Sequence, residues 1–155
     1  EPTQDGRVMH PCLEATMPST LSVTAEHKHG LNFEVQCRGH RFNTDYPLAP
    51  EDPGLGQRPL EVLLSSLATC VGGTLALLLR KRGMDFSRLG VAASAERQDQ
   101  HPTLFTRIDL LVLVSGVGLE GRSVQLLWDE SGEKICPVAA MLRPAVPITV
   151  TCKVL

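Results

Sequence analysis

The sequence has few aromatic residues and almost no net charge. Phe, Trp and Tyr make up only 4% of the chain, so its core must be built from Leu, Val, Ala and Ile. It has 15 Lys and Arg residues against 17 Asp and Glu, a formal net charge of −2. This balance excludes the strongly basic surface that binds nucleic acid or an anionic membrane. With 43% hydrophobic residues in 155, the composition is that of one soluble globular domain.

The cysteines do not form the pattern of a secreted disulfide framework. There are five, an odd number, and their spacing is irregular: Cys12, Cys37, Cys70, Cys136 and Cys152. A disulfide-rich secreted domain has an even number of cysteines in a shorter chain. We therefore expect reduced thiols in a cytoplasmic protein, where any disulfide is transient and catalytic.

The order of elements predicts an α+β protein. Residues 1–19 are rich in Pro and polar groups and are predicted to form an N-terminal arm, with a single domain over residues 20–155. Alternating apolar and polar residues predict strands, and Pro, Gly and basic residues bound the helices. The predicted elements are two strands and a short third between Thr20 and Thr44, a helix from Pro59 to about Gly83, strands Leu89–Arg97 and Leu104–Val114, a helix Leu119–Lys134, a short helix from Cys136–Pro137 that Pro144 stops, and a strand Val146–Val154.

The central predicted helix contains the longest apolar run in the chain. Val62 to Leu79 carries no charge, which raises the possibility of a membrane span. Against a span, the run is single, lies mid-chain between predicted strands, and contains Ser65, Ser66, Thr69, Gly72, Gly73 and Thr74. We interpret it as a soluble helix buried on nearly all sides. One small sheet cannot cover every face of such a helix, so a homodimer is expected.

Cys70 stands in the middle of this helix and has two interpretations. It could be an inert packing residue, or a nucleophile that a second thiol can reach. It lies too far from the helix start to use the dipole there, so a reactive thiolate needs a nearby cation from elsewhere. Cys136 precedes Pro137 and is predicted to be the N-cap of a short helix, where backbone N–H groups favour a thiolate. That position suits a resolving thiol, although a plain buried N-cap is the alternative.

Glu61 is the only charged residue at the head of the central helix. Its simplest role is to complement the helix dipole. It could also hold an arginine or lysine beside a thiolate. Nine residues separate it from Cys70, which places it on the opposite face and about 13 Å away along the axis. Direct contact within one regular helix is therefore excluded.

The helix sequence resembles the signature of the OsmC/Ohr family, the osmotically inducible and organic hydroperoxide resistance proteins. The segment running from Pro59 through Glu61 to Cys70 is similar to the family pattern P-x-E-x-L-L-x-x-L-x-x-C. Cys136–Pro137–Val138 resembles the second-cysteine motif of the family, and the segments 96–97 and 105–108 resemble its strands. The resemblance covers residues 20–155.

The resemblance implies a fold and an activity. The fold is an OsmC-like one, with antiparallel sheets wrapped around a long central helix in an intertwined homodimer. The activity is that of a cysteine-based, peroxiredoxin-like peroxidase in the oxidative stress response. Cys70 would attack an organic hydroperoxide, Cys136 would resolve the sulfenate, and an external dithiol of the lipoyl type would reduce the disulfide. Glu61 would orient the activating cation. No metal or organic cofactor is implied.

One departure from the family concerns that cation. The family arginine comes from the loop between the first two strands, and residues 25–31 contain none. Lys28, Arg38 and Arg41 are the candidates to replace it. The missing arginine motivates an alternative function, a non-peroxidase dimer that senses thiol oxidation or binds a small hydrophobic ligand between Leu63, Leu67 and Leu77.

A metal site is a weaker alternative. His27 and His29 form one closely spaced pair, and His10 and Cys12 form another. Pairs of this kind are weak signals without a third and a fourth ligand. No metal is therefore predicted.

Overall fold

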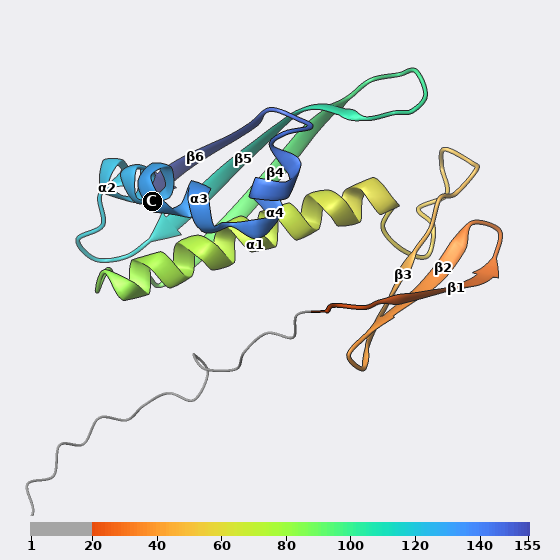
Figure 1. The fold of residues 1–155 in the computed structure, drawn as a ribbon, viewed down its shortest axis with the longest axis horizontal. Coiled ribbons are helices and arrows are strands. Elements are labelled where there is room, and N and C mark those ends of the chain that lie inside the picture. The colour runs from red at the N-terminus through yellow and green to blue at the C-terminus, as the bar shows by residue number, and fades with distance from the viewer. Residues whose placement is uncertain (1–19) are drawn as a thin grey trace, which may run out of the picture.

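A computed structural model of the chain describes residues 20–155, and the predicted arm over residues 1–19 lies outside this range. The chain forms a long helix and two three-stranded sheets, of which one packs along the helix and the other lies beyond its N-terminal end (Figure 1). The first sheet is an antiparallel meander of β1 (Thr24–His29), β2 (Asn32–Cys37) and β3 (His40–Thr44). The second contains β4 (Arg88–Arg97), β5 (Phe105–Ser115) and β6 (Ile148–Val154). The α+β prediction is confirmed.

The long helix α1 (Pro59–Lys81) begins and ends where its sequence signals predict. Pro59 occupies the first helical position, where its fixed φ and missing N–H cost nothing. At the other end Gly83 has a φ of +67°, a left-handed conformation that glycine adopts without strain. Its N–H donates to the carbonyl of Arg80, which satisfies one of the free carbonyls of the last turn.

The hydrophobic core lies between α1 and the second sheet. The side chains of alternate β5 residues, Ile108, Leu110, Val112 and Val114, are at most 2% exposed. They pack with Leu67, Val71, Leu75, Leu78 and Leu79 of α1. Aliphatic residues therefore supply most of this core, as the scarcity of aromatics requires.

Two features of the C-terminal half differ from the prediction. The last strand, β6, runs parallel to β5 and not antiparallel, because helices carry the chain back across the sheet before β6 begins. The helix predicted over residues 119–134 is also broken. It consists of α2 (Gly121–Leu127), a π-helical turn η1 (Trp128–Gly132) and α3 (Glu133–Ile135). The short helix α4 (Pro137–Leu142) follows as predicted.

The first sheet stands apart from the hydrophobic core (Figure 1). Its three strands make their main contacts with one another. It is joined to the start of α1 through the backbone of Gln57, whose carbonyl accepts the N–H of Asp45 at 3.1 Å. Large apolar side chains remain exposed on it, among them Phe33 at 37% and Phe42 at 45%.

The helix α1 is long and apolar enough to cross a membrane, by length and composition alone. A central core helix passes the same test. Here α1 packs against β4, α2, η1 and α4, which supports the interpretation as a core helix.

Candidate dithiol site

The structure brings Cys70 and Cys136 together, although 66 positions separate them in the sequence. Their sulfur atoms are 3.3 Å apart, with Cys136 on the α4 side and Cys70 in the middle of α1. Both are reduced thiols. Since a disulfide bond is about 2.05 Å long, the two atoms need to approach by little more than 1 Å to become bonded.

The two thiols differ in their access to solvent. Cys136 is 0% exposed and belongs to the core, whereas Cys70 is only half-buried. Within one chain, Cys70 is therefore the more accessible residue of the pair. This asymmetry suits Cys70 as the thiol that attacks and Cys136 as the thiol that resolves.

Cys136 is held in place by the turn before it and the helix after it. It is the N-cap of α4, as predicted, with Pro137 in the first helical position. Its N–H donates to the carbonyl of Gly132 at 3.0 Å, and its carbonyl accepts the N–H of Ala140 at 3.0 Å. The backbone on both sides of Cys136 is thus fixed, which aims its side chain at α1.

Burial dominates the electrostatics of Cys136. Removal from water raises the pKa of its thiol, and the neighbouring Cys70 sulfur raises it further. Hydrogen bonding by the Ala139 N–H and by the Thr74 hydroxyl acts in the opposite direction but does not offset burial. The backbone N–H of the N-cap turn favours the thiolate, as predicted, but burial outweighs it and the pKa of the Cys136 thiol is raised.

Glu61 lies at the head of α1 and is engaged there. Its carboxylate accepts the backbone N–H of Arg58 at 2.8 Å, which closes the first turn of the helix. Arg58 also stacks on Tyr46, with its guanidinium carbon 5.3 Å from the ring centre. The role predicted for Glu61, orienting a cation beside the Cys70 thiolate, stays a prediction.

The three candidate cations all lie in the β1–β3 sheet. Lys28 is paired with two carboxylates, at 2.8 Å from Glu26 and 3.6 Å from Glu34, and the hydrogen bond with Glu26 raises its pKa. Arg38 occupies the β2–β3 turn with a φ of 49°, and Arg41 follows in β3. Within residues 20–155, no basic side chain forms a hydrogen bond with either thiol of the pair.

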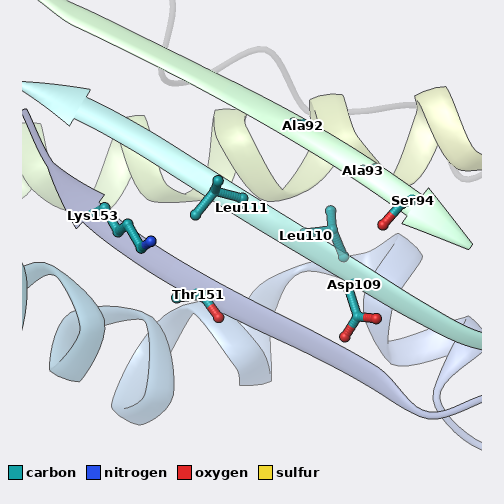
Figure 2. Close-up of a pocket in the computed structure, with 8 residues that line it drawn as sticks. All are labelled: Ala92, Ala93, Ser94, Asp109, Leu110, Leu111, Thr151 and Lys153. Carbon is teal, nitrogen blue, oxygen red and sulfur yellow. The ribbon is translucent and has the colours of Figure 1, made fainter.

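One pocket of the described chain is not part of the dithiol site. It measures about 420 Å³ and lies over the β4–β6 sheet, where Figure 2 shows Ser94, Asp109, Thr151 and Lys153 among its lining residues. It contains neither cysteine.

The hydrophobic pocket predicted between Leu63, Leu67 and Leu77 is not formed within one chain. Leu67 is 0% exposed in the core, whereas Leu63 and Leu77 are 37% and 40% exposed. Among the described residues, no group of three or more His, Cys, Asp or Glu side chains could hold a metal ion. The predicted pair His10 and Cys12 lies outside the described range.

Thr74 is a site residue that the sequence did not single out. It lies four positions after Cys70, so the two side chains share one face of α1, and its hydroxyl is among the groups that lower the pKa of the Cys136 thiol. In the sequence, only its spacing of four residues from Cys70 could have indicated this position. That spacing alone could not predict a role, because Cys136 comes from a distant part of the chain.

An α+β fold with two small sheets, whose long helix presents one cysteine to another at the start of a short helix, defines a class of dithiol proteins. The chain belongs to the OsmC-like protein family, whose profile matches residues 52–151. It is 35% identical over 121 residues to the protein YhfA of Escherichia coli strain K12, covering 77% of this chain and 87% of YhfA. This confirms the resemblance to the OsmC/Ohr family.

Solved structures show the same fold. An OsmC-like protein from Mycoplasma pneumoniae superposes with a TM-score of 0.78 at 19% identity, covering 90% of this chain and 99% of that one. An organic hydroperoxide resistance protein from Elizabethkingia anophelis superposes with a TM-score of 0.68 at 18% identity, covering 90% and 99%.

Proposed function

We propose that this protein is a thiol-dependent peroxidase that reduces organic hydroperoxides in the cytoplasm. The observation that carries the proposal is the 3.3 Å contact between a half-buried Cys70 and a fully buried Cys136. Membership of the OsmC-like family supports it, and so does the shared fold with a protein named for organic hydroperoxide resistance.

The oxidative half of the reaction uses both cysteines in turn. The Cys70 thiolate attacks the outer oxygen of the hydroperoxide, the O–O bond breaks, and the electron pair leaves with the alkoxide, which takes a proton to become an alcohol. Cys70 is then a sulfenic acid. The Cys136 sulfur attacks the Cys70 sulfur, the S–O bond breaks, and the hydroxyl leaves as water. The oxidised protein then contains a Cys70–Cys136 disulfide.

The reductive half needs an external dithiol, for which a lipoyl-type group is the expected class. Its thiolate attacks the accessible Cys70 sulfur and releases Cys136. The second thiol of the reductant then attacks the mixed disulfide, which frees Cys70 and leaves the reductant as a cyclic disulfide. In this scheme all electrons pass through sulfur, so neither a metal nor an organic cofactor takes part.

A homodimer would complete the site. In the most apolar stretch of 18 residues in α1, only 33% is buried within the chain. Leu63 and Leu77 flank Cys70 at spacings of seven and are exposed on the same face. We propose that a second copy covers this face with its β1–β3 sheet, burying Phe33 and Phe42 as well. The sheet would carry basic residues toward Cys70, and Arg38 or Arg41 are better candidates than Lys28, whose charge is already paired.

The test follows the loss of an alkyl hydroperoxide with purified protein and a dithiol. We expect turnover that Cys70→Ser abolishes. Without added dithiol, Cys136→Ser should still consume one equivalent of hydroperoxide but should form no intramolecular disulfide. Arg38→Met or Arg41→Met should slow the oxidative step at least tenfold, whereas Lys28→Met should leave it within about twofold. Absence of turnover, or turnover that survives Cys70→Ser, would contradict the proposal.

A further inference from the structure

Cys136 stands at a corner between two very short helices. The helix α3 has three residues and α4 has six, and Cys136 between them has an extended backbone, with φ −72° and ψ 106°. Helices this short are not stable by themselves, so other contacts must hold the corner. Its position matters for the chemistry, because the Cys136 sulfur lies 3.3 Å from that of Cys70 and a disulfide bond needs about 2.05 Å.

One backbone carbonyl at this corner has no helical partner. In a continuous helix the carbonyl of Glu133 would accept the N–H of residue 137. Residue 137 is a proline, which has no N–H to donate. The carbonyl before it, that of Gly132, accepts the N–H of Cys136 at 3.0 Å. The Glu133 carbonyl therefore needs a donor from another part of the chain.

Arg143 supplies this donor. Its Nη1 donates to the Glu133 carbonyl at 3.0 Å and lies 2.9 Å from Oε1 of the Glu133 carboxylate. The backbone of Arg143 is itself held, since its N–H donates to the carbonyl of Ala139 in α4 at 3.0 Å. The Arg143 side chain is 25% exposed, and a hydrogen bond from a charged donor is stronger than one between neutral groups. The contact joins the end of α4 to α3 and so closes the chain around Cys136.

We infer that Arg143 is a positioning residue for disulfide formation, whose guanidinium caps the Glu133 carbonyl and holds Cys136 against Cys70. A thiol on a fixed backbone is present at its partner at a high effective concentration. Without the contact, the reduced corner can open, whereas the oxidised corner is still held by the covalent S–S bond. Disulfide formation then costs more ordering, so its equilibrium constant falls. This inference rests on the proposed Cys70–Cys136 disulfide chemistry.

The experiment measures that equilibrium with no hydroperoxide present. The reduced protein is equilibrated with glutathione and glutathione disulfide. The two cysteine thiols lose two protons and two electrons as their S–S bond forms, and the S–S bond of glutathione disulfide breaks to give two glutathione thiols. Peptide mapping then gives the fraction of protein with the Cys70–Cys136 disulfide.

The variants at Arg143 give the expected effect. Arg143→Met keeps a long side chain and removes the donor, so the equilibrium constant should fall about tenfold, the effect of losing one hydrogen bond from a charged group. Arg143→Lys keeps a cationic donor and should restore the constant to within about threefold of the wild-type value. Arg143→Ala serves if the methionine variant does not fold.

Two matched variants separate positioning from a general loss of stability. Glu133→Gln removes the ion pair but leaves the backbone carbonyl that Arg143 caps. Because the Glu133 carboxylate is half-exposed, the equilibrium constant should stay within about twofold. Arg107→Met breaks another arginine–carboxylate pair, at 2.7 Å from Asp109 on β5, and should leave the constant unchanged.

The inference is overturned if Arg143→Met has the wild-type equilibrium constant, or if Arg143→Lys is as defective as Arg143→Met. It is also overturned if Glu133→Gln or Arg107→Met lowers the constant as far, or if the wild-type protein forms no Cys70–Cys136 disulfide. Absence of hydroperoxide turnover, with the disulfide equilibria as expected, would instead count against the proposed function alone.

Discussion

Replacing Gly132 with alanine would put a methyl group where the ring of Trp128 already lies. A Cβ at Gly132 would contact Cε3 of Trp128 and lie 2.9 Å from Cζ3 and 3.0 Å from Cδ2. The ring is 2% exposed in the core and cannot swing into solvent. Overpacking of this kind costs about 1–3 kcal/mol. For a chain of this size the melting temperature should fall by about 3–10 °C.

The substitution should also reach the dithiol site. The carbonyl of Gly132 accepts the N–H of Cys136, so a displaced η1 turn moves Cys136 relative to Cys70. We expect slower disulfide formation by diamide as well as a lower melting temperature by circular dichroism. Gly90→Ala is the matched control, since a Cβ there meets nothing within 4 Å. The reasoning fails if Gly132→Ala melts at the same temperature as Gly90→Ala.

Three further predictions concern stability measured by urea unfolding. Burial raises the pKa of Cys152 to about 11, so the unfolded chain loses this proton first as the pH rises from 9 to 11. The free energy of unfolding should fall by about 2 kcal/mol over this interval, and a decrease of equal size in Cys152→Ala would contradict the assignment. Asn32→Ala should cost about 2 kcal/mol, since it leaves the Thr44 carbonyl and the Asn43 amide unpaired at a buried position, and a loss below 0.5 kcal/mol would refute this. Gln125→Leu should lower the free energy of unfolding by about 2 kcal/mol and speed hydrogen exchange at the Cys152 amide. The Gln125 side chain donates to the Val150 carbonyl at 3.1 Å and accepts the Cys152 N–H at 2.7 Å, both on the edge strand β6. Unchanged exchange at Cys152 would refute this prediction.

The sequence predicted those elements whose ends carry strong local signals. Pro59 and Gly83 bound the central helix in the sequence and in the structure, because a fixed φ at one end and a positive φ at the other are properties of single residues. The η1 turn carries no such signal. Gly132 within a helical stretch was the only hint, and its reason, the Trp128 ring, is a contact visible only in the structure.

The sequence predicted the two cysteines of the candidate site but not the burial and the neighbouring groups that surround them. The two cysteine motifs identified Cys70 and Cys136, and the structure places their sulfur atoms in contact. The effect of the N-cap on the pKa of Cys136 was predictable because it is local, whereas the larger effect of desolvation depends on everything that packs around the sulfur. Thr74 was missed for the same reason. The parallel pairing of β5 and β6 likewise depends on the path of the chain across the sheet.

The central claim is that Cys70 and Cys136 form the working redox pair, and intact mass with peptide mapping tests it most directly. The reduced protein is treated with one equivalent of an alkyl hydroperoxide, and the remaining thiols are then alkylated and the peptides sequenced. The account predicts a Cys70–Cys136 disulfide, with Cys12, Cys37 and Cys152 recovered as thiols. A Cys70 that stays reduced, or one that pairs with another cysteine in place of Cys136, would contradict it.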